Sequence, residues 1–168
     1  NKKINIYATY NQNKIKIKDI KSFQVDLLNN EKYLYDFIKK KNNLNIYYLS
    51  SPKIVLDDFS KENSMILNKF FYDIPKKILE ITKNKKINFF YPSTEFITSQ
   101  NKSLYSSTKL KAERMIKKFN INKNKVYFYR LPKINTKQNL SLINEKLINF
   151  RDLLDKDQEL QKIFFFEN

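Results

Sequence analysis

Apolar and polar residues along this chain follow two different periods. Short apolar runs bounded by polar residues are typical of buried strands, whereas apolar residues three or four positions apart are typical of helices. The predicted strands are residues 3–10, 23–25, 44–49, 87–91, 126–130 and 162–166, with residues 14–18 as a weaker candidate. The predicted helices are residues 30–41, 61–82, 104–120 and 140–155. Pro75 should kink the second helix or split it in two, because proline cannot donate a helical hydrogen bond.

This order of elements predicts an α/β fold. Strands that alternate with helices imply a mainly parallel sheet with helices on both faces. A length of 168 residues fits one domain with a real hydrophobic core, and 15% aromatic residues argue against disorder. No segment approaches the roughly twenty apolar residues of a membrane span. We therefore expect a cytoplasmic protein.

The residue types present restrict the chemistry. The sequence contains no cysteine and no histidine, which excludes thiolate nucleophiles and histidine-based triads and makes a zinc site improbable. Tyrosine, lysine, serine, threonine and the carboxylates remain as candidates. We predict no metal site.

Tyr105 and Lys109 are the strongest candidates for a reactive pair. Their i, i+4 spacing on the predicted helix 104–120 places both side chains on one face. A lysine ammonium beside a phenol favours the phenolate and should lower its pKa. Ser93 and Thr94, at the end of the preceding strand, could hold the oxygen that exchanges the proton. The pattern indicates carbonyl/alcohol redox chemistry, and the alternative is a plain pair on a helix surface.

The chain here resembles the extended short-chain dehydrogenase/reductase family, which includes nucleotide-sugar epimerases, dehydratases and reductases. The segment from Pro92 to Ile97 looks like the family's strand end with its serine or threonine. Tyr105, Lys109 and Glu113 look like its Tyr-x-x-x-Lys-x-x-x-Glu motif, and the segment Arg130-Leu131-Pro132 looks like a later strand end. The resemblance covers about residues 3–135 and implies a Rossmann-like fold.

The resemblance extends to positions that contact a cofactor in the family. Asp26 looks like the aspartate that contacts the adenine, although it could equally be a turn residue at a strand end. Ser50 lies near the end of the segment 44–51, which resembles another family strand, and Asn68 stands where the family has an asparagine on its long helix. Phe71 or its neighbour replaces a glycine there, which argues against an easy fit of a nicotinamide ring.

The resemblance implies a set of roles. Tyr105 would be the general acid or base, Lys109 would lower its pKa and contact the nicotinamide ribose, and Ser93 or Thr94 would hydrogen-bond the reacting oxygen. Glu95 is either an additional acid or a solvated loop carboxylate. The implied cofactor is NAD or NADP, and Lys14 and Lys16 beyond the first strand favour NADP slightly. The implied cofactor-binding residues are Asp26, Ser50, Asn68, Lys109 and Pro132.

The chain also departs from the family. The family opens with a strand, a glycine-rich turn and a helix that binds the pyrophosphate, whereas this chain has no glycine and its first strand looks like the family's second. We therefore expect a Rossmann-like domain over residues 1–134 without its first strand and phosphate-binding loop. Residues 135–168 would begin a substrate-binding region. Either the missing segment precedes residue 1, or the protein is a degenerate, noncatalytic relative that acts through a partner.

The net charge of +16 suggests polyanionic ligands. Nucleic-acid binding is one alternative, but the lysines are scattered and no RNA- or DNA-binding motif is visible. A dinucleotide and a nucleotide-sugar substrate would use the same positive field. The resemblance also implies a homodimer through the helices at residues 61–82 and 104–120.

Overall fold

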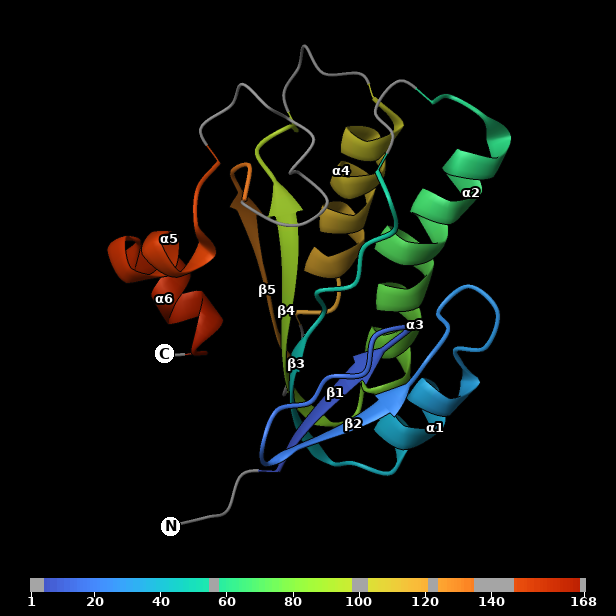
Figure 1. Cartoon of the computed structure of the whole chain (residues 1–168), viewed down its shortest axis with the longest axis vertical. Helices are drawn as coiled ribbons and strands as arrows, with labels where there is room; N and C mark the ends of the chain where they lie inside the picture. Colours follow the sequence, from blue (N-terminus) through green and yellow to red (C-terminus); the bar gives the residue numbers. More distant parts are fainter. Residues whose placement is uncertain (1–4, 55–57, 98–102, 121–123, 135–146, 167–168) are drawn as a thin grey trace. The chain divides into compact units, whose positions relative to one another are not determined.

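The computed structural model describes residues 5–54, 58–97, 103–120, 124–134 and 147–166 (Figure 1). The chain divides into two compact units, Asn1–Lys41 and Asn42–Asn168.

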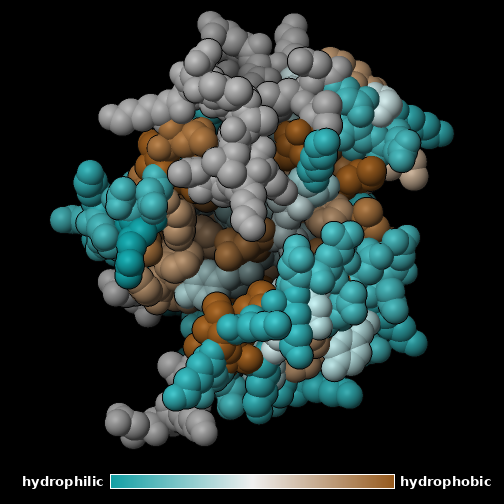
Figure 2. Space-filling model, in the orientation of Figure 1, coloured by the Kyte–Doolittle hydropathy of each residue, from teal (hydrophilic) through white to brown (hydrophobic). Residues whose placement is uncertain are grey.

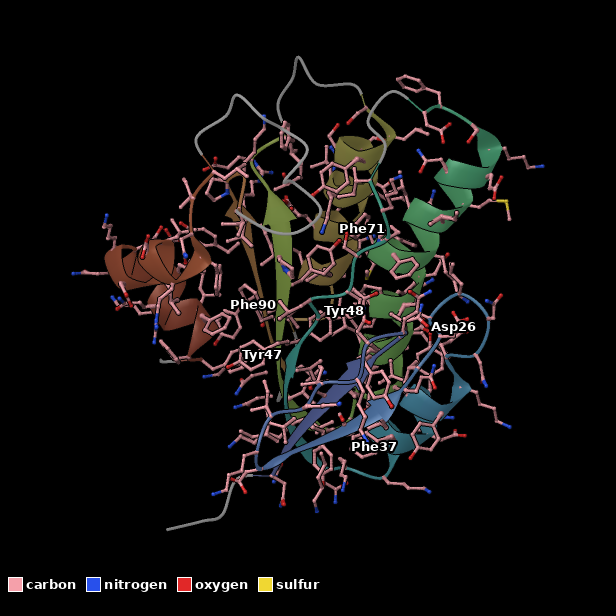
Figure 3. All side chains as sticks on the ribbon, viewed as in Figure 1. Asp26, Phe37, Tyr47, Tyr48, Phe71 and Phe90 are labelled. Atoms are coloured by element: carbon pink, nitrogen blue, oxygen red, sulfur yellow. The ribbon has the colours of Figure 1, made fainter. Side chains whose placement is uncertain are left out.

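The first unit is a two-stranded parallel sheet with one helix. Strand β1 (Ile6–Tyr10) pairs with β2 (Ile20–Gln24), and helix α1 (Lys32–Lys39) follows. The Phe37 ring of α1 lies 4.9 Å from the Tyr7 ring on β1 and 5.0 Å from the Phe23 ring on β2 (Figure 3). One aromatic side chain therefore joins the helix to both strands. Residues 14–18, the weaker strand candidate, form no strand.

The second unit is built on a three-stranded parallel sheet in the order β3-β4-β5. These strands are β3 (Asn43–Tyr47), β4 (Lys86–Thr94) and β5 (Asn124–Leu131). The central strand β4 carries Phe89, Phe90 and Tyr91, which are fully buried. Because alternate side chains of a strand point to opposite faces, this run supplies the core on both sides of the sheet.

Helices cover both faces of this sheet (Figure 1). One face carries α4 (Leu104–Lys117) together with α2 (Lys61–Asn68) and α3 (Ile74–Ile81). The other face carries α5 (Phe150–Lys156) and α6 (Gln158–Phe164), whose apolar residues pack around Phe90. Figure 2 shows hydrophilic side chains over the outward sides of α1, α2 and α5.

The fold class is as predicted: α/β and Rossmann-like, with parallel strands and helices on both faces of the larger sheet. In the doubly wound order 3-2-1-4-5-6, the pair β2-β1 corresponds to positions 3-2, and β3-β4-β5 corresponds to positions 4-5-6. Position 1 of that order has no counterpart among the described residues, as the sequence also predicted.

The predicted long helix at residues 61–82 is interrupted before Pro75. Residues Lys69–Asp73 form a π-helical turn between α2 and α3, in which the Ile74 N–H donates to the Lys69 carbonyl. This i→i−5 bond leaves the Phe70 carbonyl without its helical donor, and Pro75 has no N–H to offer Phe71. The expected break is therefore a π turn rather than a kink at the proline itself.

Two buried tyrosines satisfy the carbonyls that this turn leaves open. The Tyr48 hydroxyl donates to the Phe70 carbonyl at 2.6 Å, and the Tyr91 hydroxyl donates to the Phe71 carbonyl at 3.0 Å. Tyr48 follows β3 and Tyr91 lies on β4, so both hydroxyls fix the π turn to the sheet. This fixes the position of the Phe71 side chain beside α4 (Figure 3).

The predicted strand at residues 162–166 is wrong. Residues Gln158–Phe164 form helix α6, whose first turn is capped by the Asp157 carboxylate accepting from the Leu160 N–H at 2.8 Å. The apolar run has the composition of a strand, but its side chains pack as one helix face on the sheet. Tertiary packing thus overrides local propensity. Of the predicted helix 140–155, residues 140–146 lie outside the described residues, and α5 accounts for the end.

Candidate functional site

The predicted catalytic residues meet where β4 ends and α4 begins. Ser93 and Thr94 are the last residues of β4 and pair in register with Arg130 and Leu131 of β5. Helix α4 begins after Ser103, whose hydroxyl accepts a hydrogen bond from the Ser106 N–H at 3.2 Å. This cap fixes the first turn of α4, which carries Tyr105.

Tyr105, Lys109 and Glu113 stand one turn apart on α4. The i, i+4, i+8 spacing puts all three on the side of the helix that packs against the sheet. Lys109 and Glu113 are buried, and Tyr105 is half-buried. A helix that buries two ionisable groups needs polar partners for them. Those partners come from β4 and β5.

Thr94 is the hydroxyl that contacts Tyr105. Burial raises the pKa of the Tyr105 phenol, and the nearby Thr94 hydroxyl lowers that pKa by less. The net direction is upward, opposite to the lowering expected from Lys109. The physical reason is that desolvation of the phenolate outweighs the effect of the Thr94 hydroxyl.

Lys109 is enclosed by aromatic rings. Its Nζ lies 4.0 Å from the centroid of the Phe71 ring, 4.6 Å from that of Tyr91 and 5.9 Å from that of Tyr105. It donates a hydrogen bond to the Pro92 carbonyl at 2.7 Å, and the residue is only 5% exposed. Burial lowers the pKa of Lys109 to about 7, and the nearby Glu113 charge opposes that shift. The amine therefore loses its proton more readily than an exposed lysine does.

Ser93 belongs to a second cluster. Its hydroxyl donates to the Oε1 of Glu113 at 2.5 Å, and Arg130 donates to both oxygens of the same carboxylate, at 3.0 Å from Nε and 2.9 Å from an Nη atom. Glu113 is almost completely buried, whereas the Arg130 side chain is 45% exposed. Glu113 raises the pKa of Arg130. The carboxylate thus links β4, α4 and β5.

The four predicted catalytic residues are therefore near one another but not in one network. Thr94 lies near the Tyr105 phenol, and the Lys109 Nζ is 5.9 Å from the centroid of the Tyr105 ring. Ser93, the first choice from sequence for orienting the reacting oxygen, is engaged by Glu113 instead. The geometry favours Thr94 for that role. Glu95, the next residue, is exposed.

The predicted cofactor-binding residues are more dispersed. Asn68 ends α2, donates to the Ser64 carbonyl at 2.8 Å and accepts from the Lys111 Nζ at 3.1 Å. Ser50 is half-buried in the segment after β3, and Pro132 is half-buried directly after β5. Since the ends of parallel strands meet at one edge of a sheet, Ser50 and Pro132 follow strands that end at the same edge as Ser93.

Asp26 lies in the first unit and has the contacts of a turn residue. Its Oδ1 accepts from the Leu28 N–H at 2.9 Å and from the Asn29 N–H at 3.2 Å, and its Oδ2 accepts from the Asn29 side-chain amide at 2.8 Å. The Asn29 side-chain bond, followed by the Leu28 backbone bond, lowers the pKa of Asp26. The turn alternative left open by the sequence is thus realised. A contact with adenine stays a prediction.

Sequence reasoning missed the roles of Phe71 and Tyr91. The signal for Phe71 was present, since an aromatic residue stands where the resembling family has glycine, but nothing in the sequence indicated that its ring would lie on the Lys109 amine. Among the described residues, no group of three or more aspartates and glutamates could hold a metal ion. The described part of the chain contains no helix that is both long and apolar enough to cross a membrane.

Solved structures of short-chain dehydrogenases share this fold. The enzyme from Leptospira borgpetersenii with bound NAD+ matches with a TM-score of 0.66 at 14% identity, over 96% of this chain and 74% of that chain. The enzyme from Burkholderia cenocepacia in complex with NADP matches with a TM-score of 0.62 at 14% identity, over 82% of this chain and 63% of that chain.

A monomeric L-threonine 3-dehydrogenase from a metagenome, in its apo form, matches with a TM-score of 0.60 at 17% identity, over 77% of this chain and 46% of that chain. The chain thus spans less than two thirds of the length of two of these three proteins. No family model and no curated protein matches the sequence. At these identities the likeness establishes the Rossmann-like fold of the short-chain dehydrogenases.

Proposed function

We propose that this chain belongs to an NAD(P)-dependent oxidoreductase, epimerase or dehydratase that acts on a nucleotide-sugar. The observation that carries the proposal is the position of the Thr94 hydroxyl near the Tyr105 phenol, at the carboxyl end of β4. Ligands of open α/β sheets bind at that edge. The fold shared with dehydrogenases described with NADP and NAD+ supports a nicotinamide cofactor. The nucleotide-sugar rests on the resemblance of the motif residues to the extended branch of the family.

The protonated phenol of Tyr105 suits it to one direction of proton transfer. A phenol that is protonated at neutral pH is ready to donate a proton to a substrate oxygen, and Thr94 would hold the same oxygen. Proton transfer by a positioned side chain typically contributes roughly 10²- to 10⁴-fold to a rate. Tyr105 would therefore act first as a general acid on a carbonyl.

The fit of a nicotinamide cofactor is partial. A bound nicotinamide would supply the hydride, and Thr94 and Tyr105 suit the substrate oxygen. Lys109 does not fit a ribose in this conformation, because its amine donates to the Pro92 carbonyl and is covered by Phe71. We therefore assign no cofactor contact to Lys109 in the arrangement described.

The test is turnover of UDP-, GDP-, TDP- and CDP-sugars with NAD(H) and NADP(H). Tyr105→Phe should lower turnover about 100-fold or more while cofactor affinity, measured by fluorescence titration, stays nearly unchanged. Tyr33→Phe, at an exposed tyrosine of α1, is the matched control. Full turnover by Tyr105→Phe would refute the catalytic assignment.

The covered Lys109 favours one alternative, a noncatalytic Rossmann relative. Such a relative binds a dinucleotide or nothing and acts through a partner, and it turns over no sugar nucleotide. The variant Phe71→Leu distinguishes a cofactor site that the Phe71 ring covers from a protein that has no cofactor site. Cofactor binding that appears only in Phe71→Leu identifies the ring as the block, and no binding in either protein supports the noncatalytic relative.

A further inference from the structure

A groove runs between α3 and α4, away from the Thr94–Tyr105 pair. Its volume is about 740 Å³. One wall comes from the π turn, α3 and Lys83, the second residue after α3, and the other comes from α4 and the residues that follow it. The lining residues are Tyr72, Lys76, Lys83, Ser107, Leu110, Lys111, Arg114, Met115, Lys118 and Phe119.

The floor of this groove is apolar. Met115 is buried, and Leu110 and Phe119 are half-buried, so part of their hydrophobic surface faces the groove. Tyr72 is also half-buried, and the Lys111 Nζ lies 4.1 Å from its ring centroid. Aliphatic and aromatic surface in a concave groove is what an apolar side chain of a partner can bury.

The rim is cationic. Lys111, Arg114 and Lys118 follow one another at i, i+3 and i+7 along one edge, and Lys76 and Lys83 stand on the other. Lys76 is 3.7 Å from Glu80, and Lys111 donates to Asn68. No carboxylate in the described part of the chain lies within salt-bridge distance of Lys83, Arg114 or Lys118.

We propose that this groove binds an acidic amphipathic helix of a protein partner. The walls run from Tyr72 to Lys83 and from Ser107 to Phe119. At 1.5 Å per residue each wall is roughly 16–18 Å long, which is about three turns of a third helix. The apolar face of such a helix would pack on Leu110 and Phe119, and its carboxylates would meet Arg114 and Lys118.

Charge complementarity selects this occupant over two others. The family resemblance implies a homodimer through these same helices. A second copy of the chain would, however, bring the same cations to face one another across a two-fold axis, and like charges oppose that contact. A single-stranded nucleic acid would stack bases on aromatic rings. One face of Tyr72 is already covered by Lys111, which leaves Phe119 as the other aromatic ring of the groove. The proposal is independent of the proposed function.

The test uses a synthetic helical peptide of about fourteen residues, or four turns, with leucines at i, i+3, i+4 and i+7 and glutamates beside them. A scrambled peptide of the same composition and a short oligothymidylate are the comparison probes. Fluorescence anisotropy should show the helical peptide binding about tenfold more tightly than the scrambled one, a difference of about 1.4 kcal/mol. Binding should also weaken as salt is raised.

Arg114→Glu with Lys118→Glu should weaken peptide binding about tenfold or more. Lys14→Glu with Lys16→Glu, at exposed lysines of the first unit, makes the same change in net charge and should leave binding nearly unchanged. If the double charge-reversal variant unfolds, the charge-neutralising variant Arg114→Gln with Lys118→Gln replaces it. Equal binding of both peptides, tighter binding of oligothymidylate, or a wild-type homodimer that the reversed pair dissociates would each overturn the proposal.

Discussion

The Ser93 hydroxyl donates a 2.5 Å hydrogen bond to the Oε1 of Glu113, a carboxylate that Arg130 holds from the other side. The carboxylate is buried and has one hydroxyl and one guanidinium as donors. Burying a charge is costly unless such donors satisfy it. The arrangement therefore ties the end of β4 to α4 and β5, and it engages Ser93 but not Thr94, whose hydroxyl oxygen accepts a hydrogen bond from the Phe96 N–H.

The first prediction concerns stability. Glu113→Ala should lower the free energy of unfolding by about 2–3 kcal/mol, because Ser93 and Arg130 lose their acceptor. The half-exposed Arg130 is partly solvated, which keeps the loss below that of a fully buried pair. Ser93→Ala should cost about 1 kcal/mol. Urea unfolding measures both.

Glu80→Ala is the matched control for that prediction. Glu80 is a half-exposed glutamate on α3 whose ion pairs with Lys76 and Lys77 are 3.7 and 3.9 Å long. Surface pairs of this kind contribute about 0–1 kcal/mol. If Glu113→Ala unfolds at the same urea concentration as Glu80→Ala, the buried carboxylate does not hold the three elements together.

The second prediction separates the two hydroxyls at the end of β4. In the proposed enzyme, Thr94→Val should lower turnover about tenfold or more, since it removes the hydroxyl beside the Tyr105 phenol. Ser93→Ala should leave turnover nearly unchanged when assayed below its unfolding temperature. Steady-state kinetics on the best sugar nucleotide measures both. A larger loss of turnover from Ser93→Ala than from Thr94→Val would return the role to Ser93.

The third prediction concerns pH. The pKa of Lys109 is about 7 in the folded protein against 10.5 for an unperturbed lysine. Between these values the unfolded chain binds a proton that the folded chain does not, so stability rises with pH across this window. The slope from this residue is at most about 1.4 kcal/mol per pH unit. Its contribution is constant below about pH 7 and above the unfolded value.

Lys109→Met should remove that slope. The difference in unfolding free energy between the variant and the wild type should therefore change between about pH 7 and 10.5 and level off below about pH 7. Lys83→Met, at an exposed lysine, should run parallel to the wild type. Parallel curves for Lys109→Met as well would mean that the amine stays solvated and protonated in the folded protein.

The sequence predicted the order of strands and helices well because the spacing of apolar residues is most regular in the segments that form the hydrophobic core. The buried residues Phe89, Phe90 and Tyr91 lie on β4. The bounds of β4 and α4 differ by at most three residues from those of the predicted strand 87–91 and the predicted helix 104–120. It failed at residues 162–166, where an apolar run has the same composition in a strand and on one face of a helix. That choice depends on packing against Phe90, which is distant in sequence.

The candidate site was predicted in part for the same reason. Helical spacing alone places Tyr105, Lys109 and Glu113 on one face. Which hydroxyl contacts which side chain depends on the register of β4 against β5, where Ser93 is level with Arg130. The direction of the Tyr105 pKa depends on burial, and the cover over Lys109 depends on a π turn that positions Phe71. Neither property is encoded locally.

The last prediction tests the aromatic enclosure of Lys109 directly. A lysine with a pKa of about 7 would react quickly with an amine-specific acylating reagent if it were exposed, because more of it is neutral. Here the residue is 5% exposed and Phe71 covers the Nζ at 4.0 Å, so labelling must wait for local opening. Mass spectrometry of the labelled protein should find Lys109 modified more slowly than the exposed Lys83 and Lys118. Phe71→Leu should raise the rate at Lys109 about tenfold through easier local opening and leave the two exposed lysines unchanged. Fast labelling of Lys109 in the wild type would show that the amine is accessible, and it would restore Lys109 as a residue that can reach a bound ribose.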